Sequence, residues 1–465
     1  MLNLQIERSD RYDFIVCGGG PSGFSAAINA ARKDLKVALI ESQGCLGGTA
    51  TSGGINYLLA GRKLNDQTRE HVRVIGGLFD EITDNLILGG YAIEPNTINL
   101  DFNPFGWYPR MASGIVFDEN AMKVLMDSMC EELGIRVYLN TTVVSAQRNQ
   151  RMIESVIVHN KDGFVELMGS CFADCTGDAD VAAMSGCSCD IGREVDGLTA
   201  PASLEMHVDH VDGEALVMYQ NKHQSPKLVE IIEELKEKGI WKFPYEIFVC
   251  MQLMEKDIFL INTIRQIAVD GTSEASISKA IAYGRKENRE LFNIMKAYFP
   301  GFSNARIRKI SDWIGIRESR RIRGREIITL EAALKGKKYP NRIGATTYNF
   351  DLPDPLHPSY DPMMGDAKRP NASRRHIVIQ IPYESLLPKE IDNLIVAGRC
   401  ISAEREVLGA IRIMGPSMQM GQAAGTAAAL AFTHHCGIFA DVHIPQLQDI
   451  LWKDGVLDPE TLPID

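Results

Sequence analysis

Three features that this chain lacks narrow the classes of protein to which it can belong. No uncharged apolar run reaches the roughly 18 residues that a membrane-spanning helix needs, and the best candidate, Ala423 to Phe432, is far too short. The N-terminal segment is polar and has no apolar signal core, so we expect a cytoplasmic protein. Basic residues number 49 against 60 acidic ones, and the net charge of −11 argues against broad contact with nucleic acid or an anionic membrane.

The ten cysteines lack the paired spacing of a metal site. Cys171, Cys175, Cys187 and Cys189 are separated by three, eleven and one residues, which fits no CxxC pattern for zinc or iron–sulfur clusters. The first two lie in an apolar, strand-like segment, where free cysteine commonly packs as a small hydrophobic residue. We therefore expect reduced thiols and no bound metal, with a metal cluster as the less favoured alternative.

The most informative feature is an apolar strand that runs directly into three spaced glycines. The segment reads DFIVCGGGPSG, with Gly18, Gly20 and Gly23 in a GxGxxG pattern. In such a pattern the first glycine makes a tight turn, the second lets the backbone approach a pyrophosphate, and the third lets the next helix pack on the sheet with its N-terminus toward the anion. A second strand ends at Glu41, about 20 residues later, where a carboxylate can bind a ribose hydroxyl. The sequence thus predicts a dinucleotide site rather than an ordinary glycine-rich turn.

Elements of mixed type follow this site. An amphipathic helix is predicted over 118–133, and Gly134 ends it. We expect its buried face to consist of Ala121, Val124, Leu125, Met129 and Leu133. Strands are predicted around 136–138, 142–146 and 155–159. The pattern is typical of an α/β domain.

The middle of the chain, about 200–385, changes character. It holds charged helices at 226–239 and 273–299 and a loop rich in proline, aspartate and asparagine over 339–373. From Asp392 the α/β pattern returns, with a strand and then a helix from about Pro416 to His435. We therefore predict a nucleotide-binding domain in several pieces, with a substrate domain inserted between them.

The C-terminal third contains no second convincing GxGxxG, so no separate nicotinamide domain is expected. Instead a strand ends at Gly398-Arg399 and a helix opens at 415–417. Proline suits the first turn of a helix because it has no amide hydrogen to leave unpaired. Gly421 and Gly425, four residues apart, permit another backbone to approach closely, although helix packing alone also explains them.

With these motifs the chain resembles a family of FAD-dependent oxidoreductases related to fumarate reductase flavoproteins and thiazole-forming enzymes, and most of all its bacterial subgroup. The resemblance covers nearly the whole chain and includes the Gly18–Gly23 loop, Glu41, Gly47-Gly48, ADCTGDADVAA, GIRESRRIRG, IPYESLLP, AGRCISA and GQAAGTAAALA. It implies a Rossmann-like FAD-binding domain, doubly wound and glutathione-reductase-like, over residues 1–200 and 386–465. An α+β substrate or cap domain would occupy residues 201–385.

The resemblance also implies how FAD binds. The glycine loop would hold the pyrophosphate, Glu41 would bind the adenosine ribose, and the backbone of Val143 would contact the adenine. The C-terminal helix would direct its N-terminus at the N1–C2 side of the flavin, where reduced flavin carries negative charge. Many flavoproteins have an acidic residue after the last strand, whereas this chain has Arg399, which would meet either a cofactor phosphate or the substrate. The complete set is Gly18, Gly20, Pro21, Ser22, Gly23, Glu41, Ser42, Gly47, Gly48, Thr49, Thr51, Val143, Thr176, Gly177, Asp178, Gly398, Arg399, Arg412, Met414 and Ser417.

Four residues are candidates for catalysis or substrate binding. Arg317 and Arg321 lie in an arginine-rich segment whose apolar start predicts burial, and arginine forks suit carboxylates and phosphates. An ion-pair network with Glu318 is the equal alternative for this segment. His207 lies in an alternating strand pattern similar to a pocket-lining strand of related flavoproteins, although a packed histidine is the more common reason for such a residue. Glu406 stands where the family shows an acidic residue near the flavin.

The resemblance implies a hydride transfer between flavin N5 and a small organic substrate, because FAD itself carries out the redox chemistry. Dehydrogenation of a C–OH or C–N bond is favoured over reduction of an activated C=C bond. The alternatives are a thiazole-forming, non-redox use of the scaffold and a flavoprotein electron-transfer subunit. The electron acceptor or donor would be external, and a homo-oligomer is left open. Tyr383 and Tyr360 are further candidates for proton transfer, and Cys45 leaves covalent flavin attachment open.

Overall fold

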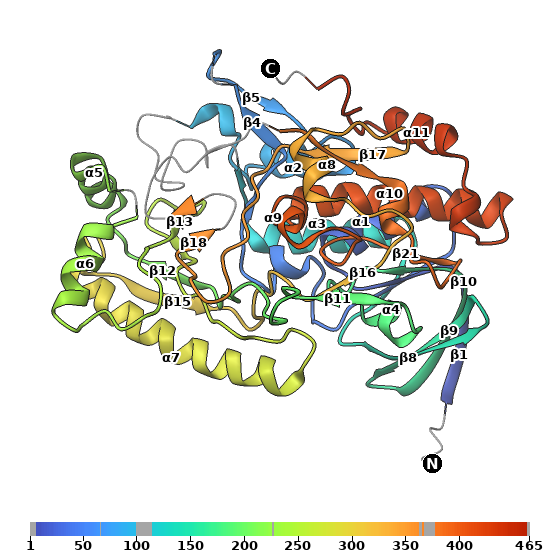
Figure 1. The fold of residues 1–465 in the computed structure, drawn as a ribbon, viewed down its shortest axis with the longest axis horizontal. Coiled ribbons are helices and arrows are strands. Elements are labelled where there is room, and N and C mark those ends of the chain that lie inside the picture. Colours follow the sequence, from blue (N-terminus) through green and yellow to red (C-terminus); the bar gives the residue numbers. More distant parts are fainter. Residues whose placement is uncertain are drawn as a thin grey trace.

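The computed structural model describes residues 6–65, 67–98, 114–225, 227–361, 365–366 and 377–462. A seven-stranded sheet dominates one half of the fold, on the right in Figure 1. Its order is β7-β2-β1-β10-β9-β8, with β21 also paired to β10. Strands β7, β2, β1, β10 and β21 pair in parallel, whereas β9 pairs antiparallel with both β10 and β8. The strands are β1 (Ile6–Cys17), β2 (Val37–Ile40), β7 (Arg136–Tyr138), β8 (Thr142–Asn149), β9 (Met152–Asn160), β10 (Gly163–Asp174) and β21 (Leu394–Val396). The α/β fold with a parallel sheet that the sequence predicts is confirmed.

Two helices from opposite ends of the chain, α1 (Pro21–Ala31) and α10 (Met414–His434), pack against each other beside this sheet (Figure 1). Glycines on α10 make the close contact possible. A Cβ added at Gly421 would lie 2.0 Å from Ser22 O, and one at Gly425 would lie 2.2 Å from Ala26 O. The two glycines therefore let the backbones of α1 and α10 touch, as their spacing predicts.

The helix predicted over 118–133 is α3 (Glu119–Glu132), with Asp118 as its N-cap. Its buried residues are Met122, Met126, Met129 and Cys130, whereas Val124 is 65% exposed. The expected buried face was thus wrong at Val124. A second stripe of apolar residues with helical spacing, led by Met122 and Met126, faces the core instead, because α3 packs on α1 and on α2 (Leu78–Leu88) through that stripe.

A second assembly covers residues 206–310 and lies on the left in Figure 1. Its four-stranded antiparallel sheet has the order β13-β14-β12-β15. These strands are β12 (Met206–Asp209), β13 (Cys250–Gln252), β14 (Phe259–Ile261) and β15 (Arg306–Ile310), and the helices beside them are α5 (Gly213–His223), α6 (Val229–Glu237) and α7 (Glu274–Tyr298). Aromatic rings such as Trp241, Phe248 and Phe302 fill a separate core. This core is distinct from that of the large sheet.

The segments on either side of 206–310 join the two assemblies. The arginine-rich segment is extended, with β16 (Arg320–Ile322) paired to β11 (Cys189–Ile191). Strands β17 (Arg342–Thr346) and β20 (Ile379–Pro382) pair with each other, and their Ile343 and Ile381 pack in the core of the large sheet. The second core is therefore narrower than the 201–385 unit expected from the sequence, and the domain boundaries remain a prediction.

The remaining strands and α-helices are β3 (Tyr57–Leu58), β4 (Arg62–Leu64), β5 (His71–Arg73), β6 (Ile115–Val116), α4 (Asp180–Met184), α8 (Leu330–Leu334), β18 (Tyr360–Asp361), β19 (Gly365–Asp366), α9 (Arg405–Ile411) and α11 (Ile444–Lys453). In the described part of the chain, none of the helices combines the length and the apolar character needed to cross a membrane. The loop predicted over 339–373 lies partly outside the described residues.

Candidate functional site

A cavity of about 930 Å³ lies between the large sheet and the second assembly. Parts of its wall follow directly on parallel strands: Gly18 after β1, Glu41 after β2, Cys175 after β10 and Gly398 after β21. Other wall residues come from the neighbourhood of β13 and β14 and from the segment that leads into β16. Ligands of open α/β sheets bind at the carboxyl ends of the strands. This cavity is therefore the candidate site.

The glycine turn after β1 shapes one end of the cavity. Gly18 has a φ of 98°, and its N–H donates to Ile40 O at 2.8 Å. Gly20 is the N-cap of α1 and lines the cavity, and an added Cβ there would meet nothing within 4 Å. The first turn of α1 has no side-chain cap and no acidic residue, so its N–H groups can serve an anion. Pro21 and Ser22 line the cavity beside them.

Some predicted cofactor residues support the cavity wall from behind. A Cβ at Gly23 would lie 1.7 Å from a backbone oxygen of the glycine turn, so Gly23 sets the helix packing. Gly47 has a φ of 103° and donates its N–H to that turn. Thr51 is fully buried and its hydroxyl donates to a backbone oxygen at 2.6 Å. Gly48 and Thr49, by contrast, line the cavity.

Glu41 is held in a fixed orientation at the cavity wall. Its Oε2 accepts the N–H of Gly19 at 2.8 Å, and its Oε1 accepts the N–H of Gln43 at 2.8 Å and the hydroxyl of Ser42 at 3.2 Å. The side chain is only 6% exposed, yet it lines the cavity, as do Ser42 and Val143 of β8. A carboxylate so oriented can accept further hydrogen bonds from a ribose.

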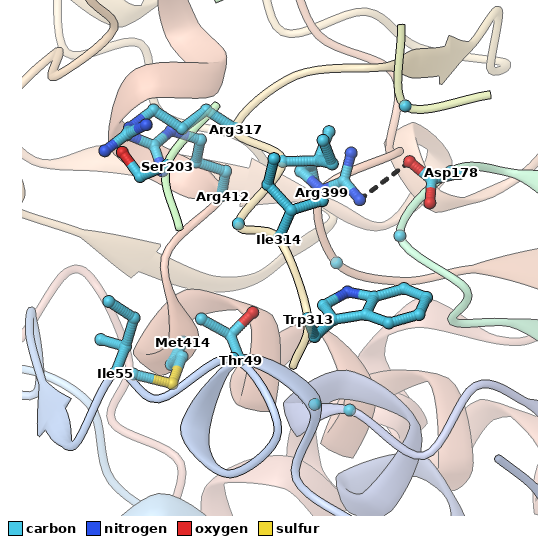
Figure 2. Close-up of a pocket in the computed structure, with 18 of the residues that line it drawn as sticks. Thr49, Ile55, Asp178, Ser203, Trp313, Ile314, Arg317, Arg399, Arg412 and Met414 are labelled. Atoms are coloured by element: carbon cyan, nitrogen blue, oxygen red, sulfur yellow. Dashed lines mark ion pairs between the residues drawn. The ribbon is translucent and has the colours of Figure 1, made fainter. Parts of the chain in front are cut away.

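Arg399 and Asp178 form an ion pair across the wall, with Nη2 and Oδ1 2.9 Å apart (Figure 2). Arg399 Nη1 also donates to Ser319 Oγ at 2.6 Å. The charge of the arginine is thus balanced by a carboxylate of the chain itself, a partner that the sequence left unassigned. The cavity is also lined here by Thr176, Gly177 and Gly398.

The N-terminus of α10 forms another part of the wall. Ile413, its N-cap residue, offers no side-chain cap, and the first turn has no acidic residue. Met414 and Ser417 line the cavity. Arg412 precedes the helix, lines the cavity and donates from Nη2 to Asp351 O at 2.7 Å. Two helix N-termini without a carboxylate therefore meet this cavity, and both favour a negative ligand.

Arg317 is the sequence-predicted catalytic residue that reaches the cavity. Its Nη1 donates to Pro201 O at 2.6 Å and its Nη2 to Asn262 Oδ1 at 3.2 Å. Burial lowers the pKa of Arg317, and the charges of Arg265 and Arg412 lower it further. The group remains a cation, because guanidinium groups keep their proton in proteins. Figure 2 shows Arg317, Arg412 and Ser203 at one end of the view, apart from the dashed Arg399–Asp178 pair.

Sequence reasoning missed three polar wall residues near Arg317: Glu205, Asn262 and Arg265. Burial raises the pKa of Glu205, while the charges of Arg317 and Arg265 oppose that rise. The alternation of SLEMHVDH pointed to this strand, but it drew attention to His207 and not to Glu205 two residues earlier. Asn262 and Arg265 carry no local motif, so the sequence held no signal for them.

Arg321 lies away from the cavity in the ion-pair network that was its alternative interpretation. Its Nη1 donates to Glu318 Oε1 at 2.8 Å, and Arg405 Nε lies 3.0 Å from Glu318 Oε2. Glu318 is fully buried and also accepts the N–H of Ala200 at 2.8 Å. This network joins the arginine-rich segment to α9 and has a structural role.

His207 and Glu406 are not among the residues that line the cavity. His207 is buried with its Nε2 2.8 Å from Gly54 O, and burial lowers its pKa. It is a packed histidine, which was the more common alternative. Glu406 lies half-buried in the first turn of α9. Their role in catalysis therefore stays a prediction that the cavity wall does not support.

Among the further candidates for proton transfer and flavin attachment, some line the cavity and others do not. Tyr360 lines the cavity, whereas Tyr383 is buried and donates to Phe439 O at 2.9 Å. Cys45 is not part of the wall, and its sulfur lies 3.4 Å from Ser52 Oγ. Trp313, at the start of the arginine-rich segment where burial was expected, lines the cavity and is 38% exposed.

All ten cysteines are free thiols, and burial raises the pKa of Cys171 to about 12. Cys171 and Cys175 pack in the core beside β10. Among the residues that the structure describes, no group of three or more His, Cys, Asp or Glu side chains is placed to hold a metal ion.

These features fit FAD. Gly20 leaves open space where a Cβ would project, two helix N-termini favour a pyrophosphate and a flavin carbonyl, and Glu41 offers an oriented acceptor. The fold and the site define a protein that binds a dinucleotide at the carboxyl edge of a parallel sheet. The chain belongs to the FAD dependent oxidoreductase family, whose sequence profile matches residues 13–451. It is an oxidoreductase with FAD as its cofactor.

Individual relatives are more distant. Dihydrolipoyl dehydrogenase of Trypanosoma brucei brucei is 54% identical over 43 residues, which are 9% of either chain. A geranylgeranyl bacteriochlorophyll reductase-like protein from Thermoplasma acidophilum shares 11% identity with a TM-score of 0.47, over 96% of this chain and 83% of that one. A triple mutant of the flavin-dependent brominase Bmp2 shares 11% identity with a TM-score of 0.48, over 95% and 84%. Similarity this low carries no argument about substrate, and the relationship to fumarate reductase flavoproteins, to thiazole-forming enzymes and to bacteria remains a prediction.

Proposed function

We propose that this protein transfers a hydride between flavin N5 and a small organic substrate that binds in the cavity, with dehydrogenation of a C–OH or C–N bond as the favoured reaction. The observation that carries this proposal is the continuity of the cavity. It is lined at one end by the glycine turn and Glu41, and elsewhere by Arg317 and Asn262. One site can thus hold both a dinucleotide and a second molecule.

In this proposal, the chain's own residues place FAD along the large sheet. The N-terminus of α1 and the turn from Gly18 to Ser22 bind the pyrophosphate, and Glu41 binds the ribose. The N-terminus of α10 would stabilise the negative charge that reduction adds to the N1–C2 side of the flavin. FAD supplies the hydride chemistry, and the protein supplies position and electrostatics. Residues 201–385 are proposed as the substrate or cap unit of this cytoplasmic enzyme.

Oxidation stays the favoured direction, with reduction of an activated C=C bond as its alternative. Reduction of such a bond requires an acid beside a carbon atom, and the carboxyl group that lines the cavity near Arg317 is Glu205 rather than His207 or Glu406. Oxidation of an alcohol or amine releases a proton from oxygen or nitrogen, which water can accept. The reductase and the electron-transfer subunit remain the alternatives, and the experiment separates them.

The test begins with the visible absorption spectrum of the purified protein before and after acid precipitation, which shows whether FAD is bound and whether it is released. The FAD-loaded protein is then mixed anaerobically with alcohols and amines, and the decrease of flavin absorbance is followed. We expect at least one such donor to bleach the flavin. If none does, and reduced protein is reoxidised only by an activated alkene or only by a protein partner, dehydrogenation is contradicted.

A further inference from the structure

We infer that the substrate of this site is a monocarboxylate with an apolar body, whose carboxylate binds Arg317 and Asn262. This inference rests on the proposed function because it concerns the same cavity. It goes beyond that function in naming the chemical class that the wall selects.

Arg317 is a buried cation with an accessible face. It lies deep in the molecule between the two assemblies, yet it is only half-buried and lines the cavity, so the surface that it retains faces that cavity. Both of its hydrogen-bond acceptors, Pro201 O and Asn262 Oδ1, are neutral oxygens. Among the described residues, none contributes a carboxylate within ion-pair distance of it. A buried charge without a counter-charge is costly, and an anionic ligand removes that cost.

Asn262 offers a second donor beside Arg317. Its Oδ1 accepts from Arg317 Nη2, which orients the amide and leaves its Nδ2 as a donor. The residue follows β14, is half-buried and lines the cavity. Arginine and a neighbouring amide N–H together match the two oxygens of a carboxylate.

The nearby carboxyl groups do not neutralise Arg317. Burial raises the pKa of Glu205, while the charges of Arg317 and Arg265 lower it, and no ion pair joins Glu205 to Arg317. Asp351 lies on the side of Arg412, with its Oδ2 3.8 Å from Arg412 Nη2. With Arg265 and Arg412, three guanidinium groups of the wall stand against the two carboxyl groups of Glu205 and Asp351, so this end of the cavity keeps a net positive charge. A carboxylate supplies one negative charge, whereas a phosphate monoester at pH 7 brings nearly two.

One part of the wall is apolar. This apolar part consists of residues in and beside β3 and residues in and just before β13: Ile55, Tyr57, Leu59, Ile247, Val249 and Met251. Tyr57 and Met251 belong to one buried cluster against which Ile55 and Leu59 pack, so this part of the wall joins the two assemblies. In Figure 2, Ile55 and Met414 lie on the side of the view opposite Arg317 and Arg412. A substrate with its carboxylate on Arg317 would thus place an apolar body against these side chains.

The experiment is a titration of the FAD-loaded protein with four probes, followed by the perturbation of the flavin absorption spectrum: benzoate, benzamide, acetate and phenyl phosphate. We expect saturable binding of benzoate, with benzamide weaker because it lacks the charge and acetate weaker because it lacks the apolar body. The difference between benzoate and benzamide should be on the order of 10- to 100-fold, as for a charge-assisted hydrogen bond. This comparison uses the unaltered protein and does not depend on the folding of a variant.

Variants then assign the effect to one residue. Arg317→Met should weaken benzoate on the order of 10- to 100-fold and leave benzamide nearly unchanged, whereas Arg317→Lys should recover part of the loss. Arg323→Met is the matched control, since Arg323 is exposed, pairs with Asp190 and does not line the cavity. The FAD content of each variant verifies the fold.

Three results would overturn the inference: equal binding of benzamide and benzoate, tighter binding of phenyl phosphate, or benzoate binding that Arg317→Met leaves unchanged. These outcomes differ from a failure of the proposed function. If an alcohol or amine without a carboxylate bleaches the flavin while benzoate does not perturb the flavin spectrum, hydride transfer is supported and a carboxylate substrate is contradicted. Benzoate binding without bleaching by any donor supports the anion site and contradicts dehydrogenation.

Discussion

Arg399 Nη2 lies 2.9 Å from Asp178 Oδ1, so two charges that the sequence directs toward the cofactor neutralise each other in the cavity wall (Figure 2). Both side chains are mostly buried. The wall at this point is close to neutral as a result. Loss of either partner would leave the other charge facing the cavity.

The first prediction concerns this pair. Arg399→Met leaves the carboxylate of Asp178 unpaired beside an anionic cofactor, so we expect the dissociation constant of FAD to rise about 10-fold. Asp178→Asn should not weaken FAD, because the arginine charge that it releases attracts the phosphates. Titration of the apoprotein with FAD, followed by fluorescence, measures both. Equal weakening by the two variants would contradict the electrostatic coupling and indicate lost packing.

The second prediction separates two glycines of one motif. Gly20 has φ −68° and ψ −173°, which alanine adopts readily, and its Cβ would project into the cavity. Gly20→Ala should therefore keep its melting temperature and lose FAD affinity. In Gly23→Ala the new Cβ would lie 1.7 Å from Gly18 O, so we expect a loss of about 3 kcal/mol or more in the free energy of unfolding. Chemical denaturation of the apoproteins tests this contrast, which a destabilised Gly20→Ala would refute.

The third prediction concerns the role of Arg321. Arg321→Met removes one partner of the buried carboxylate of Glu318, and we expect it to lower the free energy of unfolding by about 3 kcal/mol. Urea denaturation measures the change. Arg323→Met, on the exposed pair with Asp190, should change stability by less than about 1 kcal/mol. If the Arg321→Met variant kept its stability but bound benzoate more weakly, the prediction would be contradicted and Arg321 would be assigned to substrate binding.

The fourth prediction concerns pH. Burial raises the pKa of Asp174 from 3.8 to about 6, although bonds from Thr176 and Ala182 oppose the shift. The folded state then binds a proton that the unfolded state has lost, so this group's contribution makes stability fall as pH rises from about 4 to about 6. Asp174→Asn keeps an acceptor and cannot ionise. Its stability relative to the unaltered protein should increase across that window by up to about 3 kcal/mol. A constant difference between the two proteins from pH 4 to pH 7 would contradict a raised pKa.

Local patterns were sufficient for the nucleotide end of the site. The strand, the three glycines and Glu41 depend on residues close in the chain, and each one serves a backbone requirement that few other residues meet. Gly18 needs its φ of 98°, and Gly23 needs the absence of a Cβ. The α/β class could be predicted for the same reason, and Gly421 and Gly425 indicated a close backbone contact without identifying α1 as the partner.

The amino-acid sequence by itself thus determined the α/β class and the glycine turn of a dinucleotide site, because these follow from short-range steric rules, whereas FAD as the dinucleotide was implied by the family resemblance. Only the tertiary structure decided which arginine faces the cavity. Arg317 and Arg321 are four residues apart in one charged segment. Arg317 donates a hydrogen bond to Asn262 and lines the cavity, whereas Arg321 forms a buried ion pair with Glu318. The partners that separate them come from distant strands and loops, and the burial of a charge depends on such long-range packing rather than on its neighbours in the chain.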